Sequence, residues 1–454
     1  MADSWTSSVD AHLDWTPGGG RAALASAVRA AIRDGRWRPG AVVPSTRALA
    51  HDLGVARGTV TRVYADLSAE GYLSTSQGAP TRVATAGTEP RSGPPVVSTD
   101  RAPRWNLMPG RPDPSLFPRE AWLAATKRVV QRSPNEVFGY HDPAGAPALR
   151  EALAAYLGRS RGVRADPARI VVCAGFTQAV AVLGRALRDL GSTRMAFEDP
   201  SFHLFRDIAA ASGQQVVVVP VDDDGLRVSE LDSPAVVVTP AHQSPLGVTM
   251  APARRTALVR SGAVVVEDDY DGEFRFDRQQ VGALQALAPE QVVYTGTASK
   301  TLAPSLRLAW MVLPRSLVDP VTEALTSSGA RPSALDQLVL ADLISSGAYD
   351  RHVRRCRLEY RSRRDRLVAA LPRDLPIRGI SAGLHLVLPL PLDAETHVPA
   401  AAARHSLAIQ PLSRFWVDPA HREGGVVVGY GASTKHAFGG ALAALLAMFH
   451  ELTS

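Results

Sequence analysis

Lysine and cysteine are scarce in this 454-residue sequence. Only Lys127, Lys300 and Lys435 are present, so nearly all of the 50 Lys and Arg residues are arginine. The two cysteines, Cys173 and Cys356, are too few for a disulfide framework or a cysteine metal cluster. We expect both to be reduced core residues, and we expect no metal centre. A lysine retained in an arginine-rich chain suggests a task that a guanidinium cannot perform.

Long apolar runs are also absent. No uninterrupted apolar stretch reaches the length of a membrane span, and the first ten residues lack the basic and apolar segments of a secretion signal. We therefore expect a cytoplasmic protein without membrane contact. A hydrophobic content of 45% and a charged content of 21% are typical of globular domains, and this length predicts two or three of them. The net charge of +6 permits a polyanionic partner but does not by itself indicate one.

The composition changes once, over residues 85–104. This segment is rich in Pro, Gly, Ser and Thr and has no apolar periodicity, which is typical of a linker. It separates a small unit, residues 1–84, from a larger one, residues 105–454. Within the larger unit we expect a large domain over about 105–314 and a smaller C-terminal α+β domain over about 315–454.

The pattern of the small unit predicts three helices and a β-hairpin. Apolar residues fall on one helical face over residues 20–35, and again over 45–53 and 56–71. Gly54 stands between the last two segments, where a tight turn favours glycine. Two short strands around a Gly-Ala-Pro turn are expected over residues 72–84. Together these elements predict a winged helix-turn-helix.

The small unit is also basic. Between Gly20 and Val83 it has nine arginines and only four acidic residues. Arg57 lies at the start of the third helix, where a helix N-terminus can contact phosphates and base edges. Such charge can be no more than a solvated surface, but its position on a helix-turn-helix favours DNA. The residues that we expect to contact promoter DNA are Ser45, Arg47, Arg57, Gly58, Thr59, Arg62 and Thr81.

The stretch VPSTRALAHDLGVARGTVTRVYADLSAEGYL resembles the winged helix-turn-helix of the GntR superfamily, and the resemblance covers nearly the whole small unit. Two positions depart from the family pattern. Ala56 replaces the usual serine before Arg57, which implies the loss of one phosphate contact. In the wing, the usual Gly-Ser-Gly-Thr is replaced by Gly-Ala-Pro-Thr at residues 78–81.

The large unit alternates strands with helices. Helical stretches separate six segments that are apolar on both faces: RIVVCAG, RMAFEDP, QQVVVVPVD, AVVVTPA, AVVVEDDY and QVVYTGTASK. Val-rich strands between helices predict a mainly parallel sheet covered on both sides, that is, an α/β fold. After about residue 314 the pattern becomes helical and arginine-rich, and it ends in short strands.

Lys300 lies in YTGTASKTLAPSLR, after an apolar strand and among small residues. A primary amine can lose its proton and form a Schiff base, as in pyridoxal phosphate proteins. That cofactor also requires an acid at its ring nitrogen, a donor at its phenolic oxygen, a phosphate cradle and a stacking group. The cofactor-binding residues that we predict are Lys300, Asp268, Tyr270, Phe202, Gly175, Phe176, Thr177, Ser299, Arg307, His242 and Gln243.

Each of these residues has a role in the predicted site. Asp268, expected at the ring nitrogen, and Tyr270, expected at the phenolic oxygen, follow a buried strand, and residues 242–243 are expected to border the phenolic side. The phosphate cradle combines the helix start after Gly175 with the neighbours of the lysine, and Phe202 is expected to stack on the ring. Taken singly, an acid at a strand end, a helix cap and a core phenylalanine are all common. Their order on successive strands is what favours a cofactor site.

From Trp105 to the C-terminus the large unit resembles fold-type I aminotransferases, and FGYHDPAGAPALREALAAYLGRSRGV is a further stretch characteristic of them. A GntR-type reader joined by a linker to such a domain is the architecture of the MocR regulators, which this chain resembles. The resemblance implies that pyridoxal phosphate forms a Schiff base with Lys300 and that the domain senses a ligand instead of turning over a substrate. It also implies a head-to-tail homodimer in which the DNA-binding domain of one chain contacts the large domain of its partner.

Two positions indicate which ligand is sensed. Members of the family that respond to amino acids resemble aminotransferases in gripping the ligand carboxylate with arginines. The corresponding positions here are Leu204 and Val427. Their apolar character favours pyridoxal phosphate itself as the effector and resembles the PdxR branch, which governs vitamin B6 biosynthesis genes.

Two alternatives stay open. One is a regulator that responds to an amino compound such as an ω-amino acid, with the carboxylate bound by Arg331, His352 or Arg414. The other is a working aminotransferase with a vestigial reader, which the missing arginines disfavour.

Overall fold

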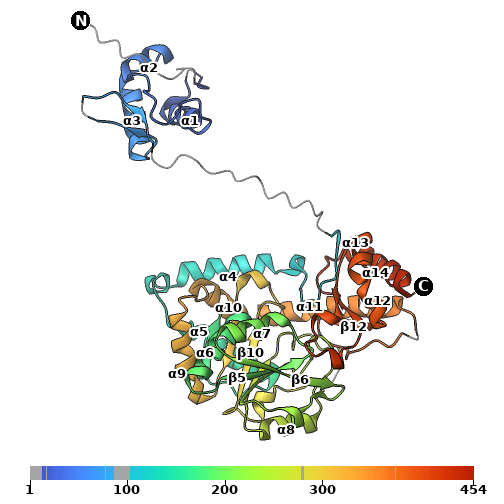
Figure 1. Cartoon of the computed structure of the whole chain (residues 1–454). Coiled ribbons are helices and arrows are strands. Elements are labelled where there is room, and N and C mark those ends of the chain that lie inside the picture. Colours follow the sequence, from blue (N-terminus) through green and yellow to red (C-terminus); the bar gives the residue numbers. More distant parts are fainter. Residues whose placement is uncertain are drawn as a thin grey trace. The chain divides into compact units, whose positions relative to one another are not determined.

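The computed structural model describes residues 13–16, 18–76, 78–85, 103–277, 281–373 and 375–453. The chain forms two compact units, Met1–Arg101 and Ala102–Ser454, which Figure 1 shows in ribbon form. We refer to them as the small unit and the large unit. Of the predicted linker, residues 86–102 lie outside the described residues. Among the described helices, none combines the length and the apolar character needed to cross a membrane.

The small unit is the predicted winged helix-turn-helix. Its helices are α1 (Gly20–Arg33), α2 (Thr46–Leu53) and α3 (Arg57–Ala69), and its wing pairs β1 (Leu73–Ser74) antiparallel with β2 (Arg82–Val83). The Ser45 hydroxyl caps α2 by accepting a hydrogen bond from the Ala48 amide at 3.1 Å. Gly54 ends α2 with a φ of 64°, a left-handed conformation that glycine adopts without strain.

An apolar core holds the three helices together. Leu24 and Val28 of α1 and Leu49 of α2 are fully buried against Val60, Val63 and Leu67 of α3. The hydroxyl group of Tyr64 donates to the carbonyl oxygen of Pro44 at 2.9 Å and fixes α3 against the segment before α2.

The large unit is built on one eight-stranded sheet with the order β4-β11-β10-β9-β8-β5-β6-β7. Neighbours from β10 to β6 are parallel, whereas β11 pairs antiparallel with both β10 and β4, and β7 pairs antiparallel with β6. The strands are β4 (Ile170–Cys173), β5 (Arg194–Asp199), β6 (Gln215–Asp222), β7 (Gly225–Leu226), β8 (Ala235–Val238), β9 (Val264–Asp268), β10 (Val292–Thr297) and β11 (Ala309–Val312). The six predicted runs are therefore all strands of one mainly parallel sheet, and the α/β prediction is confirmed. Cys173 and Cys356 are both buried and unpaired, as expected of core residues.

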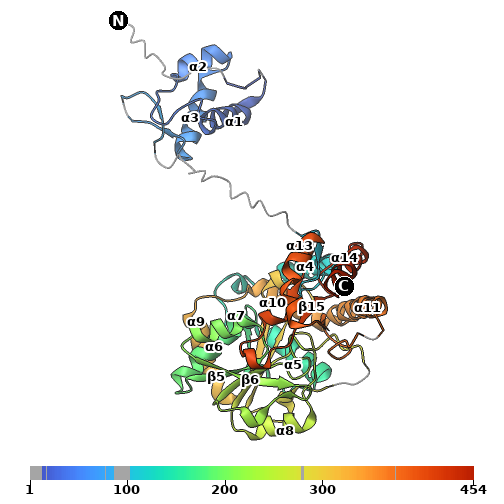
Figure 2. The same ribbon diagram turned by 45° about the vertical axis from the view of Figure 1, so that its right-hand side comes forward.

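Helices cover both faces of the sheet (Figures 1 and 2). One face packs against α6 (Phe176–Asp189), α7 (His203–Ala211) and α9 (Val318–Ser327). The other packs against α4 (Arg119–Arg132), α5 (Pro147–Arg161) and α10 (Ala334–Ser345), and farther along the sheet against α8 (Pro252–Arg260). The strands β4, β8, β10 and β11 are buried along their whole length, which favours apolar side chains on both faces.

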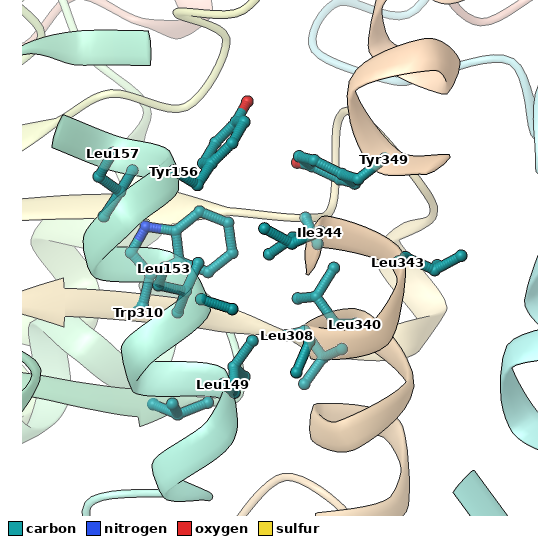
Figure 3. Close-up of a cluster of buried hydrophobic side chains, with 14 of the residues drawn as sticks. Leu149, Leu153, Tyr156, Leu157, Leu308, Trp310, Leu340, Leu343, Ile344 and Tyr349 are labelled. Carbon is teal, nitrogen blue, oxygen red and sulfur yellow. The ribbon is translucent and has the colours of Figure 1, made fainter. Parts of the chain in front are cut away.

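The predicted domain border near residue 314 differs from the observed packing. Figure 3 shows Leu340 and Ile344 of α10 facing α5 and Trp310 of β11. Helix α10 therefore belongs to the sheet domain. Helix α9 packs on the sheet as well. Their predicted place in the C-terminal domain came from a composition change, which does not reveal where a helix packs.

The C-terminal domain begins with the long helix α11 (Ala348–Ala370) and has its own core. A three-stranded antiparallel sheet orders β12 (His385–Pro389), β15 (Gly425–Gly429) and β14 (Gln410–Pro411), and a separate parallel pair joins β13 (Leu407–Ala408) to β3 (Trp105–Asn106). The remaining helices are α12 (Leu392–Thr396), α13 (Val398–Arg404) and α14 (Phe438–Thr453). Because β3 lies here, the large unit starts and ends in this domain.

Candidate functional site

A cavity of about 380 Å³ lies where the parallel strands β5, β8, β9 and β10 end, beside the start of α6. Loops at the carboxyl ends of parallel strands are the usual place for a ligand in such sheets. The cavity is closed on the opposite side by residues of the C-terminal domain, including His385 and Val427. The predicted site residues that line it are Gly175, Phe176, Thr177, Phe202, Asp268, Tyr270, Ser299, Lys300 and Arg307.

Lys300 enters the cavity just after β10, and its amine is poorly solvated. Its Nζ atom donates a hydrogen bond to the carbonyl oxygen of Gly110 at 2.6 Å. Burial lowers the pKa of this amine, against the opposing effects of Asp268 and Asp271, and the nearby positive charge of Arg111 lowers the same pKa further. A lysine with a lowered pKa is more often neutral and can act as a nucleophile toward an aldehyde.

Asp268 is the last residue of β9 and is buried within the same cavity. Burial raises the pKa of its carboxyl group well above the usual range, and the positive charge of Lys300 partly offsets this. The hydroxyl of Thr295 reaches its Oδ1 atom at 3.5 Å. A buried carboxylate with so little hydrogen bonding is suited to pair with a cationic ring nitrogen.

The start of α6 forms a cradle that fits a phosphate group. No side chain among the described residues caps this helix, so its first N–H groups remain available for an anion. Gly175 precedes the helix with a φ of 111°, and a Cβ atom there would lie only 3.1 Å from Nη1 of Arg307. Arg307 in turn donates to the Thr177 hydroxyl at 3.1 Å. Glycine at this position thus lets a guanidinium approach the helix N-terminus.

Tyr270 lines the cavity, and its hydroxyl group is hydrogen-bonded to His242. The Tyr270 hydroxyl lies 3.1 Å from Nδ1 of His242 and donates to the His242 carbonyl oxygen at 3.2 Å. The His242 Nδ1 atom also lies 2.9 Å from a carboxylate oxygen of Asp271. Burial raises the pKa of Tyr270 well above its usual range, so the hydroxyl stays protonated and can donate to a phenolate oxygen.

His242 and Gln243 are not among the residues that line the cavity, and His242 lies behind Tyr270, to whose hydroxyl it is hydrogen-bonded. The Gln243 amide group donates to the carbonyl oxygen of Pro200 at 2.8 Å, and its oxygen accepts from the Leu246 amide at 2.9 Å. The side-chain amide of Gln243 therefore connects two loops of the protein. The wall residues from this segment are Ser244 and Pro245, which were not among the predicted site residues.

Leu204 and Val427, the two positions that favoured pyridoxal phosphate as the effector, both lie in the cavity wall. Leu204 is 40% exposed at the start of α7, and Val427 is a buried residue of β15. Phe202 also lines the cavity, with its ring 6.3 Å from that of Phe415 in the C-terminal domain. Where an arginine pair could bind a carboxylate, the wall is therefore apolar.

The three residues proposed as substitute carboxylate contacts lie elsewhere. Arg331 donates to the carbonyl oxygen of His141 at 3.3 Å, His352 lies 2.6 Å from the carbonyl oxygen of Thr301, and neither they nor Arg414 line the cavity. The cation that the sequence analysis missed is Arg111, which lines the cavity from the loop before α4. Arg111 is the central residue of a Gly-Arg-Pro sequence, which has no feature that predicts a place in this cavity.

In the small unit, most of the predicted DNA contacts lie around the N-termini of α2 and α3, whereas Arg62 lies farther along α3 and Thr81 precedes β2 in the wing. Arg57, the first residue of α3, extends its Nε atom to 3.4 Å from the hydroxyl of Thr46, the first residue of α2. Ser45, Arg47, Gly58 and Arg62 are exposed like Arg57, and Thr59 and Thr81 are half-buried. Two helix N-termini and their arginines thus present partial and full positive charges on one side.

Comparisons with known proteins assign both units. Residues 110–422 match the family "Aminotransferase class I and II", and residues 21–83 match "Bacterial regulatory proteins, gntR family". The large unit resembles the crystal structure of an archaeal alanine:glyoxylate aminotransferase with a TM-score of 0.70 and 24% identity, over 76% of this chain and 91% of that one. This likeness confirms the fold-type I architecture.

Two relatives share the whole arrangement. The chain is 35% identical to the "Probable rhizopine catabolism regulatory protein MocR" of Rhizobium meliloti, over 89% of this chain and 88% of the relative. It is 32% identical to the "HTH-type pyridoxine biosynthesis transcriptional regulator PdxR" of Corynebacterium glutamicum, over 90% and 91%. Both the domain order and these relatives show the same thing: the chain belongs to the MocR subfamily of GntR-type transcription regulators, with a DNA-binding reader fused to an aminotransferase-like domain.

Proposed function

We propose that this regulator senses pyridoxal 5'-phosphate, which binds covalently through Lys300, and that it controls genes for vitamin B6 biosynthesis. The observation that carries the proposal is the single cavity that brings a lysine of lowered pKa together with a buried aspartate and an uncapped helix start. When bound, the cofactor would supply an aldehyde to the amine, a cationic ring nitrogen to Asp268 and a phosphate to the cradle of Thr177 and Arg307.

The cofactor itself is favoured as the effector because two wall positions, those of Leu204 and Val427, are apolar. Leu204 and Val427 leave no guanidinium pair for an amino-acid carboxylate. A relative that covers nearly the whole chain is named for pyridoxine biosynthesis, which fits the same effector. The cofactor would shift the protein between states of different DNA affinity by binding one of these states more tightly than the other.

The proposal is tested by titrating the purified full chain with pyridoxal phosphate. Wild type should acquire a visible absorption band, and Lys300→Ala should not, because it lacks the amine. Lys435→Ala, which removes an exposed lysine, serves as the matched control and should keep the band. A band of equal strength in Lys300→Ala would contradict the assignment.

A second candidate is a regulator of an amino compound with a negative group, because Arg111 places an additional cation in the cavity. In this case a panel of ω-amino acids should alter both the spectrum and the DNA affinity of the cofactor-loaded protein.

Residual transaminase activity is tested in the same panel with a keto acid as acceptor. We propose that such turnover is absent, and repeated turnover would contradict this.

We also propose that the protein is a cytoplasmic homodimer with a head-to-tail arrangement. Several large apolar residues are exposed on α4 and in the segment between α4 and α5, namely Leu123, Val130, Phe138 and Tyr140. A second copy would cover such side chains. Light scattering of wild type and of Leu123→Glu tests this, with a dimer expected for wild type and a loss of dimer for the variant.

A further inference from the structure

Helix α11 of the C-terminal domain carries an unusual number of arginines on its outer side. Of its eight arginines, only Arg363 is buried, and that one donates to a carboxylate oxygen of Asp113 at 2.7 Å. The other seven are exposed or half-exposed: Arg351, Arg354, Arg355, Arg357, Arg361, Arg364 and Arg366. In Figure 2, α11 lies at the edge of the large unit.

The helical repeat places these seven arginines on one continuous arc. The buried stripe runs through His352, Cys356, Tyr360, Arg363 and Leu367, so the outer side holds the remaining positions. From the first to the last of the seven arginines the helix advances about 22 Å at its usual rise.

The acidic residues of α11 do not neutralise this arc. Asp350 accepts from Arg159 at 2.8 Å, outside the helix, and Glu359 accepts from the buried Arg363 at 2.9 Å. Asp350 and Asp365 both lie on the outer arc, the latter 3.8 Å from Arg361. Two acids stand against seven arginines. The net charge of the surface is therefore strongly positive.

Folding accounts for some of these charges. Arg351 donates to the carbonyl oxygen of Ser346 at 3.4 Å, and the Arg366 guanidinium lies 5.1 Å from the centroid of the Phe438 ring. Arg355 and Arg357 bind the backbone carbonyl oxygens of Leu116 and Glu273 and so have a structural use. Arg354 and Arg364 have no carboxylate partner within 4.0 Å among the described residues. Like charges three and four residues apart on a helix are destabilising by about 0.2–0.5 kcal/mol per pair. Repeated repulsion between arginines lowers the stability of the helix. Such a loss of stability is expected where the charged face binds a ligand of opposite charge.

We propose that the outer face of α11 binds the phosphodiester backbone of duplex DNA without regard to sequence. Duplex DNA carries one charge per roughly 1.7 Å of its axis, so a segment as long as the arginine arc presents about 13 phosphates. Arginine binds phosphate oxygens through paired N–H donors. The winged helix-turn-helix is tethered to the large unit in the same chain. DNA bound to it is therefore present at a raised effective concentration for a second, weak contact with α11. This site is separate from the cavity and does not depend on the proposed effector.

The test uses the full chain and duplex DNA of random sequence, because no operator is needed to measure backbone contacts. The variant Arg354→Gln/Arg361→Gln/Arg364→Gln removes three charges from the arc. Its matched control is Arg185→Gln/Arg260→Gln/Arg315→Gln, which removes three exposed charges from other parts of the same unit. Affinity is measured over a range of salt concentrations.

Each phosphate contact contributes about 0.9 to the slope of log affinity against log salt. The α11 variant should therefore show a slope smaller than wild type by roughly two to three, whereas the control should change little. Equal slopes for wild type and the α11 variant would overturn the proposal, as would equal losses in the variant and the control. Loss of transcriptional response with an unchanged slope would also overturn it, since that result indicates an acidic protein partner. Thermal unfolding checks that the triple variant folds, and Arg354→Glu alone replaces it if it does not.

Discussion

The amine of Lys300 donates a hydrogen bond to the carbonyl oxygen of Gly110 at 2.6 Å. This bond joins the end of β10 to the loop before α4, the same loop that carries Arg111 into the cavity. An aldehyde that reacts with the amine has to replace this contact. Occupation of the cavity is therefore coupled to the position of a loop that enters the large unit from its C-terminal domain.

Arg111 is predicted to tune the lysine. Its positive charge contributes to the lowered pKa of Lys300, so Arg111→Ala should raise that pKa. A raised pKa means that less neutral amine is present at a given pH. The pH at which pyridoxal phosphate binds covalently should therefore move upward, as followed by absorbance. A control variant, Arg119→Ala, lies outside the cavity and should leave the profile in place. A downward shift for Arg111→Ala would contradict the assignment.

Gly175 is predicted to be essential for the phosphate cradle. Alanine there would place a Cβ atom 3.1 Å from Arg307 and would force a backbone conformation that side chains disfavour. We expect Gly175→Ala to weaken binding of pyridoxal phosphate about tenfold or more, which corresponds to about 1.4 kcal/mol. Binding of pyridoxal, which lacks the phosphate, should change far less. An equal loss for both compounds would show that the cradle does not hold the phosphate.

Glu198 is predicted to destabilise the fold at alkaline pH. It is buried, and burial raises its pKa from 4.5 to about 7, although Thr239 donates to it at 2.6 Å. The folded state therefore binds this proton more tightly than the unfolded state, so the stability of the fold falls as pH rises through the interval between these two values. Glu198→Gln should be more stable than wild type above pH 7 by on the order of 1–3 kcal/mol, with no advantage at pH 4.

Chemical denaturation at several pH values measures this difference. The exposed Glu151→Gln is the matched control and should run parallel to wild type. If Glu198→Gln also ran parallel to wild type across the whole range, the buried carboxyl would not be protonated in the folded protein.

The sequence predicted those parts of the fold and site that depend on local pattern. Val-rich runs identified six strands, because a strand buried on both faces has no room for polar residues. The four residues of β11 escaped notice since the run is short and follows a loop. Gln243 was expected at the cavity, but its amide turns back to Pro200 and leaves Ser244 in the wall. Arg111 was missed because only the folded chain brings it beside Lys300, which lies far along the sequence.

The predicted DNA binding by the winged helix-turn-helix depends on Arg57 at the start of α3. Its exposed guanidinium lies near the N-termini of two helices, so it can reach a base edge or a phosphate. We expect Arg57→Ala to weaken promoter binding by about 1–3 kcal/mol if the contact is bidentate to a guanine. Arg21→Ala removes an exposed arginine at the start of α1 and should have little effect. Gel-shift titrations with promoter DNA compare the two variants, and equal affinities would contradict the docking.

The most direct test of the account measures promoter affinity of the same protein with and without pyridoxal phosphate, in wild type and in Lys300→Ala. Because the cofactor is proposed to act through its bond to this lysine, it should change the affinity of wild type several-fold or more and leave that of Lys300→Ala unchanged. If pyridoxal phosphate left the affinity of wild type unchanged while binding to it, the protein would not sense the cofactor, and the central claim would be contradicted.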